Sequence, residues 1–245
     1  MNKSSSNIGL FVSCLVDLTR PEVGFAAVKL LEQSGCKVTI PKQTCCGQPA
    51  YNSGCKQEAK EIAKVTIEAF QNCEAVVVPS ASCAGMLKHH VKTLFEDPSD
   101  TSDKWHEKAL SLSARTYELT DFLYHQKNLK QVNTEFKGKI AYHESCSARR
   151  EMKLKAPFLL LNTLKGAEII ELASNEECCG FGGLFSVKFD EISNAMVQTK
   201  VNHIKNANID VLTGVDLGCL MNIGGKLAKE GHNLEVRHIA EILAD

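Results

Sequence analysis

The chain has 245 residues, a formal net charge of −1 at pH 7, 44% hydrophobic residues and 23% charged residues. This length accommodates one large domain or two of ordinary size, each with its own core. The near-neutral charge argues against nucleic acid or an anionic membrane as the main partner. The apolar run Ile8–Val12 is too short for a signal peptide, and no apolar stretch reaches the roughly 18 residues of a membrane helix. We therefore expect a soluble, cytoplasmic protein.

Apolar runs and amphipathic segments alternate along the first part of the chain. There the pattern predicts, in order, a strand at 8–13, a helix at 21–34, a strand at 37–41, a helix at 57–71 and a strand at 75–79. The second part repeats this order with a strand at 139–143, a helix at 155–165, a strand at 168–172, a helix at 188–206 and a strand at 209–213. Such alternation favours parallel βαβ units. The predicted fold class is α/β, with two pseudo-symmetric repeats of these units.

The repeats set the expected domain boundaries. Residues 1–86 form the first repeat and residues 138–245 the second. Residues 87–137 contain a sequence typical of helices from Trp105 to Gln126, and they are predicted to be a helical connector.

The eleven cysteines follow the same repeat. Each half has a cysteine after its first strand, a Cys-Cys-Gly triplet after its second and a cysteine near the end of its third. The two sets, offset by 132 to 136 residues, are Cys14, Cys45, Cys46 and Cys83, then Cys146, Cys178, Cys179 and Cys219. Right-handed crossovers bring the carboxyl ends of parallel strands to one sheet edge, where α/β folds bind ligands. Four thiols should therefore converge in each half.

The adjacent cysteines favour a polynuclear metal centre. A disulfide between neighbours is strained, whereas diverging side chains can reach two metals of one cluster. Four thiolates suit a [4Fe–4S] cluster, so two such clusters and an electron-transfer role are predicted. Zinc is the main competing metal, although the repeats lack the paired Cys-x₂₋₄-Cys knuckles of structural zinc sites. Two alternatives stay open: a thiol–disulfide reductase, and a non-enzymatic zinc or redox-sensing module.

The other candidate residues carry weaker signals. His143 precedes Cys146 by three residues and either tunes a cluster, passes protons or bonds backbone at a strand end. Arg149 either binds a carboxylate, offsets an anionic cluster or forms part of a solvated surface pair with Arg150. These two are the catalytic candidates. Cys36, Cys55 and Cys73 have no counterparts in the other half and are interpreted as ordinary small hydrophobic residues.

The cysteine pattern resembles the cysteine-rich "CCG" domain of heterodisulfide reductase B subunits and of the iron–sulfur subunit of glycolate oxidases. More closely, the chain resembles the lactate utilization protein A family. The matches span nearly the whole chain: Gln43-Thr-Cys-Cys-Gly-Gln-Pro-Ala50, Ser82-Cys83, Tyr142-His-Glu-Ser-Cys146, Cys178-Cys-Gly-Phe-Gly-Gly183, Phe185-Ser-Val-Lys188, Cys219-Leu-Met-Asn-Ile-Gly-Gly225 and Arg237-His-Ile-Ala-Glu-Ile-Leu243.

This resemblance implies a bacterial oxidoreductase subunit that acts in the oxidation of L-lactate to pyruvate. It implies two partners, a ferredoxin-like iron–sulfur protein and a third, smaller lactate-utilisation protein. One departure concerns the cluster type. The fuller CCG motif ends in Cys-x-x-Cys, but here Met86 and Asn222 stand at the last position. Four cysteines per half fit an ordinary four-thiolate cluster better than the five-cysteine cluster of the heterodisulfide reductase relatives.

Overall fold

The computed structural model describes residues 6–96, 104–173 and 175–245, and the chain divides into two compact units, Met1–Leu123 and Tyr124–Asp245. Within the described residues, each unit contains one four-stranded, fully parallel sheet with helices between its strands. The predicted α/β fold with two repeats is confirmed.

The elements of the first unit occur in the predicted order, with short helices added after the cysteine loops. They are β1 (Asn7–Leu10), α1 (Cys14–Thr19), α2 (Glu22–Gln33), β2 (Lys37–Thr39), α3 (Gln48–Asn52), α4 (Lys56–Ala69), β3 (Ala75–Val78), α5 (Ala81–Gly85), η1 (Met86–His90), η2 (Lys92–Phe95), α6 (Lys104–Ala114), β4 (Thr116–Glu118) and α7 (Leu119–Asp121), after which η3 (Phe122–Gln126) crosses into the second unit.

The second unit repeats this plan. Its further elements are β5 (Glu135–His143), η4 (Ser147–Glu151), α8 (Ala156–Leu161), β6 (Lys165–Ile170), α9 (Phe185–Lys188), α10 (Asp190–Lys205), β7 (Val211–Gly214), α11 (Leu217–Lys229), β8 (Glu235–His238) and α12 (Ile239–Ala244). The helix expected at 155–165 is shorter than predicted, because β6 already pairs with β5 at Lys165.

The two sheets have the same strand order and the same register. The orders are β2-β1-β3-β4 and β6-β5-β7-β8. Ile8 of β1 pairs with Ala75 of β3, and Ile140 of β5 pairs with Val211 of β7. In each sheet the chain therefore leaves the first strand on one side and returns on the other. This reversal makes the carboxyl ends of β1 and β3, and of β5 and β7, the places where such folds bind ligands.

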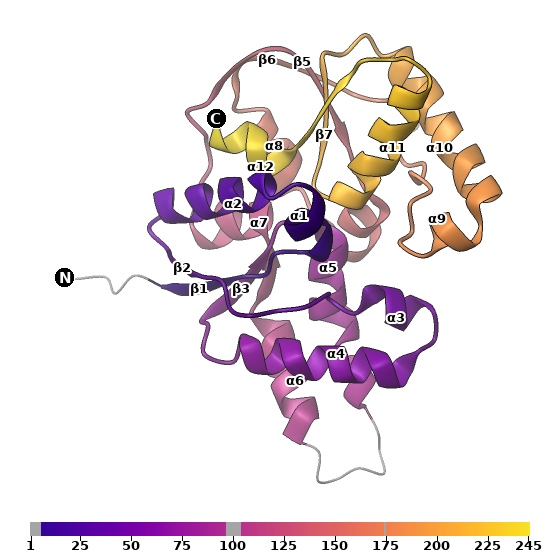
Figure 1. Cartoon of the computed structure of the whole chain (residues 1–245). Helices are drawn as coiled ribbons and strands as arrows, with labels where there is room; N and C mark the ends of the chain where they lie inside the picture. The colour runs from indigo at the N-terminus through magenta and orange to yellow at the C-terminus, as the bar shows by residue number, and fades with distance from the viewer. Residues whose placement is uncertain (1–5, 97–103, 174) are drawn as a thin grey trace. The chain divides into compact units, whose positions relative to one another are not determined.

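Burial explains why the central strands form where they do. All four residues of β3, Ala75–Val78, are buried, as expected for a strand covered by helices on both faces. In α4, Ala59, Ala63 and Ile67 are buried at helical spacing. Figure 1 shows α2 on one face of the first sheet and α4 with α6 on the other, which accounts for that burial.

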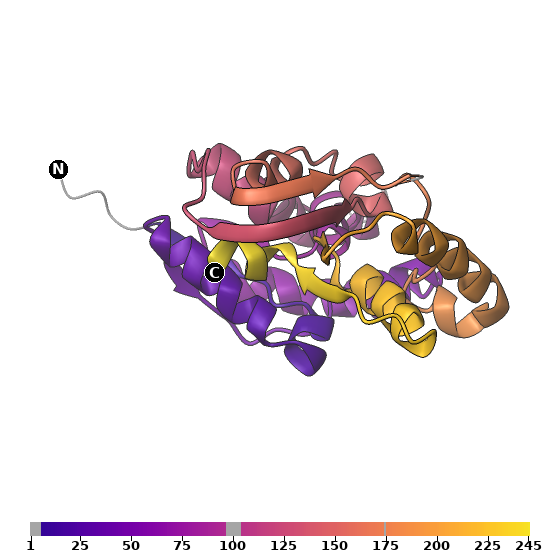
Figure 2. The same cartoon turned by 90° about the horizontal axis from the view of Figure 1, so that it is seen from above.

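Helices cover the second sheet in the same way. α10 and α11 pack against each other, and their apolar side chains Val197, Val201, Ile223 and Leu227 form one core with Leu212 of β7. α8 and α12 contact each other separately. Figure 2 shows β5 and β6 running side by side over most of their length. Among the described residues, no helix has the length and apolar character needed to cross a membrane.

The predicted helical connector at 87–137 differs from the structure. Its helices η1, η2 and α6 pack on the first unit, and it also contains β4, which pairs with β3. β4 and its counterpart β8 are short edge strands with polar residues, Thr116-Tyr-Glu118 and Glu235-Val-Arg-His238. Neither has the apolar run by which the inner strands were predicted. The fourth strand of each sheet was therefore missed.

Glu118 ends β4 and gives the first unit a pH-dependent stability. It is fully buried, and its Oε2 accepts hydrogen bonds from the backbone N–H groups of Thr120 (2.8 Å) and Asp121 (3.1 Å). Burial raises the pKa of this carboxyl to about 8, whereas an unfolded glutamate has a pKa of about 4.3. Its contribution to stability is therefore full below about pH 4 and is lost as the pH rises to about 8.

Glu118→Gln keeps an acceptor oxygen and removes this titration. We expect the free energy of unfolding of the variant, relative to the unchanged chain, to rise steadily between pH 5 and pH 8, by on the order of a few kcal/mol. Urea denaturation at one-unit pH intervals measures the difference in the free energy of unfolding between the two proteins. The other titrating groups are the same in both, so their contributions cancel in this difference. A difference that stays constant with pH would show that Glu118 is ionised when folded.

Candidate functional site

Serine caps hold the cysteine loops of the first unit. Ser13 is the N-cap of α1, and its Oγ accepts a hydrogen bond from the backbone N–H of Val16 (3.4 Å). Ser80 caps α5 in the same way, accepting from the N–H of Cys83 (3.3 Å). Serine at an N-cap satisfies a free amide and fixes where the helix begins. Cys14 and Cys83 are thus fixed at the carboxyl ends of β1 and β3.

The second unit uses a related arrangement. Ser145 precedes Cys146, and its Oγ accepts from the backbone N–H of Ala148 (3.1 Å) and donates to Oδ2 of Asp216. Asp216 is itself the N-cap residue of α11, the helix that carries Cys219. This buried serine–aspartate hydrogen bond joins the loops after β5 and β7.

The glycine of each Cys-Cys-Gly triplet has a left-handed backbone conformation. Gly47 has φ +87° and Gly180 has φ +81°, where residues with a Cβ are strained. At Gly180 a Cβ would also lie 2.6 Å from the carbonyl oxygen of Ser193 in α10. The side chain of Ser193 donates to the carbonyl of Gly180 (2.8 Å). The chain therefore turns tightly against α10 immediately after the cysteine pair.

The four predicted thiols of the first unit lie together. Cys45 is hydrogen-bonded by side chain to Cys14 and Cys46, and Cys46 is hydrogen-bonded to Cys83. The bonds that Cys45 accepts lower its thiol pKa to about 2, and the same contacts raise the pKa values of Cys14 and Cys46. The contacts within the set therefore favour a single thiolate, on Cys45.

The second unit repeats this set residue for residue. Cys178 is hydrogen-bonded by side chain to Cys146 and Cys179, and Cys179 is hydrogen-bonded to Cys219. These bonds lower the pKa of the Cys178 thiol to about 2 and raise those of Cys146 and Cys179. In both units the second cysteine of the pair, Cys46 or Cys179, is buried.

Such a set of soft donors fits a metal centre. Several thiols in contact cannot all be ionised together unless a cation lies among them, and metal binding releases their protons. The sulfur atoms come from three strand ends, as a polynuclear group with several metal atoms requires. In the cysteine inventory of the described residues no disulfide occurs. Cys36 and Cys73 are buried, as predicted, but Cys55 is exposed, so its interpretation as a buried hydrophobic residue was wrong.

Comparison with known proteins agrees with the repeat. The model of the family described as a cysteine-rich domain, CCG, matches residues 8–88 and 140–224. Lactate utilization protein A of Geobacillus kaustophilus is 48% identical over 238 residues, covering 96% of this chain and 98% of the relative. Its namesake in Shouchella clausii is 46% identical over 239 residues, covering 97% and 98%. The chain belongs to the lactate utilization protein A family.

A solved structure shares the fold of this lactate utilization protein A family member. The crystal structure of a hypothetical protein from Helicobacter pylori has a TM-score of 0.66 and 11% sequence identity. The match covers 97% of this chain and 48% of that one, so the chain spans about half its length. At this identity the likeness concerns the fold alone.

His143 lies in the second site. Its side chain is 1% exposed, and one ring nitrogen lies within 4.8 Å of the sulfur atoms of both Cys179 and Cys219. Burial lowers the pKa of His143 to about 3, with a smaller contribution from the nearby charge of Lys200. The imidazole is therefore neutral at physiological pH. This places the predicted histidine beside cysteines from two other loops, and not only beside Cys146.

Lys200 was not predicted as a residue of the site, although a lysine at its position in the helix is unusual. It lies between Val197 and Val201 on the buried stripe of α10, where an apolar residue is expected, and it is fully buried. Its Nζ donates to the carbonyl of Asn175 (3.2 Å), and burial lowers its pKa. The charges of Cys179 and Cys219 act in the opposite direction. A buried cation thus faces the second set of thiols.

Arg149 has a structural contact. Its guanidinium forms an ion pair with the carboxylate of Glu176 (2.7 Å) and donates to the Glu176 carbonyl (2.8 Å). These contacts tie η4 to the loop that leads to Cys178. Met86 is fully buried, and Asn222 donates its side-chain N–H to the carbonyl of Cys179 (2.8 Å). The two residues at the last motif position therefore support the fold and the loop.

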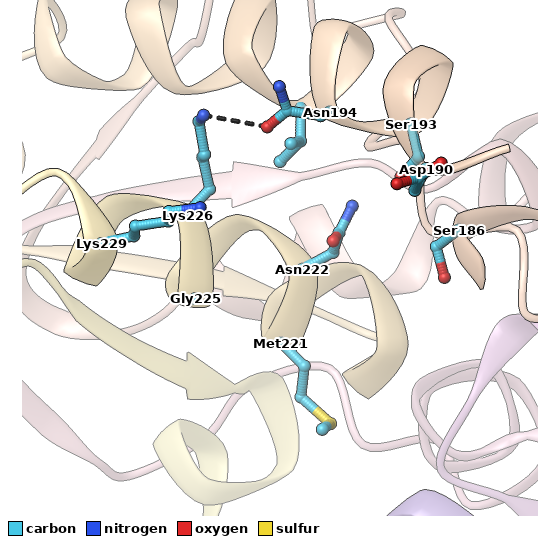
Figure 3. A pocket seen from close by; sticks show the side chains of 10 residues that line it. Ser186, Asp190, Ser193, Asn194, Met221, Asn222, Gly225, Lys226 and Lys229 are labelled. Atoms are coloured by element: carbon cyan, nitrogen blue, oxygen red, sulfur yellow. Dashed lines mark hydrogen bonds between the residues drawn. The ribbon is translucent and has the colours of Figure 1, made fainter.

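A pocket of about 360 Å³ lies behind the second Cys-Cys-Gly loop, between α10 and α11. Figure 3 shows Ser193 and Asn222 in its wall, the two side chains that hold the carbonyls of Gly180 and Cys179. Lys226 also lines it, but this lysine is engaged by Asn194 (3.0 Å) and Glu230 (3.4 Å). No cysteine lines this pocket. Two residues of its wall thus support the Cys-Cys-Gly loop.

Proposed function

We propose that the chain is an electron-transfer subunit of a system that oxidises L-lactate to pyruvate, with one iron–sulfur cluster, of the [4Fe–4S] type, in each unit. Cys14, Cys45, Cys46 and Cys83 would hold the first cluster, and Cys146, Cys178, Cys179 and Cys219 the second. Oxidation of lactate to pyruvate releases two electrons and two protons. Each cluster supplies a store for one electron at a time.

The observation that carries this proposal is the repeated four-thiol set. The same four donors, from the corresponding places in the two sheets, contact one another in both units. The relatives are named for lactate utilization, which supports lactate as the pathway substrate. A ferredoxin-like iron–sulfur protein and a third, smaller subunit are the proposed partners that accept electrons and complete the reaction.

Iron and acid-labile sulfide, measured per chain on anaerobically purified protein, test the proposal. We expect about eight of each, with absorption near about 400 nm that dithionite bleaches, because each four-thiolate site holds about four irons. About four of each would mean that only one unit binds a cluster. Zinc without sulfide would refute the electron-transfer role.

A second candidate is a thiol–disulfide reductase. It is favoured by the low pKa values of Cys45 and Cys178, since the thiolate is the nucleophile in disulfide exchange. In this case the isolated protein should reduce a disulfide substrate with a chemical reductant, and iron-free protein should retain the activity. No turnover by iron-free protein would eliminate this candidate.

A further inference from the structure

The second thiol site contains a histidine that the first site lacks. β1 and β5 pair with their neighbours in the same register, so His143, three residues before Cys146, corresponds to Phe11, three residues before Cys14. Phe11 is fully buried and packs on the ring of Phe70, with 5.8 Å between the ring centroids. The first unit thus has an apolar aromatic ring at this position, and the second has an imidazole ring with two nitrogen atoms.

Those two nitrogens have no hydrogen-bond partner among the residues that the structure describes. The side chain is 1% exposed, so its nitrogens cannot form hydrogen bonds with bulk water. Buried polar groups are nearly always partnered, because an unsatisfied one costs about 1–3 kcal/mol. The unpaired imidazole therefore points to a partner that the protein chain itself does not supply.

A purely structural histidine in the same unit looks different. His238 is also fully buried, but its Nε2 lies 3.0 Å from the carbonyl of Val215, and its Nδ1 accepts from the N–H of Ala240 (3.2 Å). Both of its nitrogens are used by the backbone. His143 has neither kind of contact, so capping and strand-end bonding do not account for it.

The distances suit a shared metal centre. The sulfur atoms of Cys179 and Cys219 and one nitrogen of His143 lie within 4.8 Å of one another. Metal–nitrogen and metal–sulfur bonds are about 2.0 and 2.3 Å long, so donors on one metal, or on neighbouring metals of a cluster, are spaced in this way. A neutral imidazole offers a lone pair to a metal.

We infer that His143 is a nitrogen ligand of the metal centre in the second unit, so that the two sites differ in kind. This inference rests on the proposed function. The first site would be bound by four thiolates, and in the second the imidazole would take the place of one of the four thiolates. Replacing thiolate by imidazole raises the reduction potential of an iron–sulfur centre, as in Rieske proteins, because less negative charge surrounds the metal. The second centre is then the electron acceptor of the pair.

The test uses protein labelled with ¹⁵N-histidine, loaded anaerobically with iron and sulfide and reduced with dithionite. Pulsed electron paramagnetic resonance measures the coupling of the electron spin to labelled nitrogen. We expect a strong coupling in the unchanged chain that is lost in His143→Phe, which copies the first unit. His125→Phe, at an exposed histidine of the same unit, should retain it. In a redox titration, His143→Phe should lower the potential of one centre and leave the other unchanged.

A second variant tests the inference without relying on the folding of His143→Phe. Cys179→Ser should leave only the centre of the first unit, and this centre should show no coupling to histidine. Iron and sulfide analysis of the unchanged chain separates the two proposals. A chain that binds neither refutes the proposed function and this inference together. A chain that binds both but lacks a strong histidine coupling, or keeps that coupling in His143→Phe, refutes only the role of His143.

Discussion

Cys179→Ser is expected to remove about half of the iron, since about four of eight irons belong to each site. Cys179 is buried and is hydrogen-bonded to both Cys178 and Cys219, so it occupies the middle of the second set. Serine preserves the size of the side chain, but its hydroxyl is a poor ligand for iron compared with a thiolate. The first site draws all its thiols from the other unit and should stay filled. Iron and sulfide per chain, with the absorption spectrum, measure the loss.

Cys73→Ala is the matched control. Cys73 is also a buried cysteine, but it packs beside Gly9 and has no counterpart in the second unit. We expect its replacement to leave the iron content unchanged. Full iron in Cys179→Ser, or loss of a cluster in Cys73→Ala, would contradict the assignment of the ligands.

Gly180→Ala is expected to destabilise the second unit by about 2–4 kcal/mol and to reduce iron binding there. A non-glycine residue at this left-handed φ costs about 1–2 kcal/mol. The new Cβ would in addition lie 2.6 Å from the Ser193 carbonyl oxygen, so the loop or α10 must move. Because Gly180 directly follows the cysteine pair, this movement displaces Cys178 and Cys179. Urea denaturation of the reduced, metal-free protein gives the change in stability, and iron analysis gives the change in binding.

Gly47→Ala separates the two causes. Gly47 occupies the same motif position in the first unit with a similar φ, but its Cβ would lie 3.4 Å from Cγ2 of Ile62, an ordinary van der Waals distance. Only the conformational penalty applies, so a loss of about 1–2 kcal/mol is expected. Equal losses at the two glycines would show that the contact with Ser193 contributes nothing.

Sequence pattern alone predicted three of the four strands of each sheet and the convergence of the thiols. Strands such as Ala75–Val78 are apolar throughout because helices cover both faces, and this leaves a strong local signal. The cysteines follow such strands directly, so their meeting point is a consequence of parallel topology. β4 and β8 carry polar residues and have no apolar run, so they could not be recognised locally.

The side chains around the thiols could not be predicted in the same way, because tertiary packing determines which of them lie near the cysteines. The sequence places His143 beside Cys146, but only the folded chain brings it near Cys179 and Cys219. Lys200 lies on the apolar stripe of α10, but only the folded chain shows that the carbonyl of Asn175 is its hydrogen-bond partner. The predicted catalytic candidate Arg149 faces Glu176, a partner that follows from the loop conformation. Such contacts between distant segments leave no periodic trace in the sequence.

The scattering of each thiol set over three strand ends has a consequence for the lifetime of the protein. A centre held by Cys14, Cys45, Cys46 and Cys83 fastens together segments that are far apart along the chain, as a disulfide does. Closing such long loops lowers the entropy of the unfolded chain and so stabilises the folded one, by about 4 kcal/mol for a single long loop. If the proposed cluster were lost to oxygen, the unit would lose this cross-link as well. Such a unit would open more often and would be cleaved by proteases sooner than an intact one.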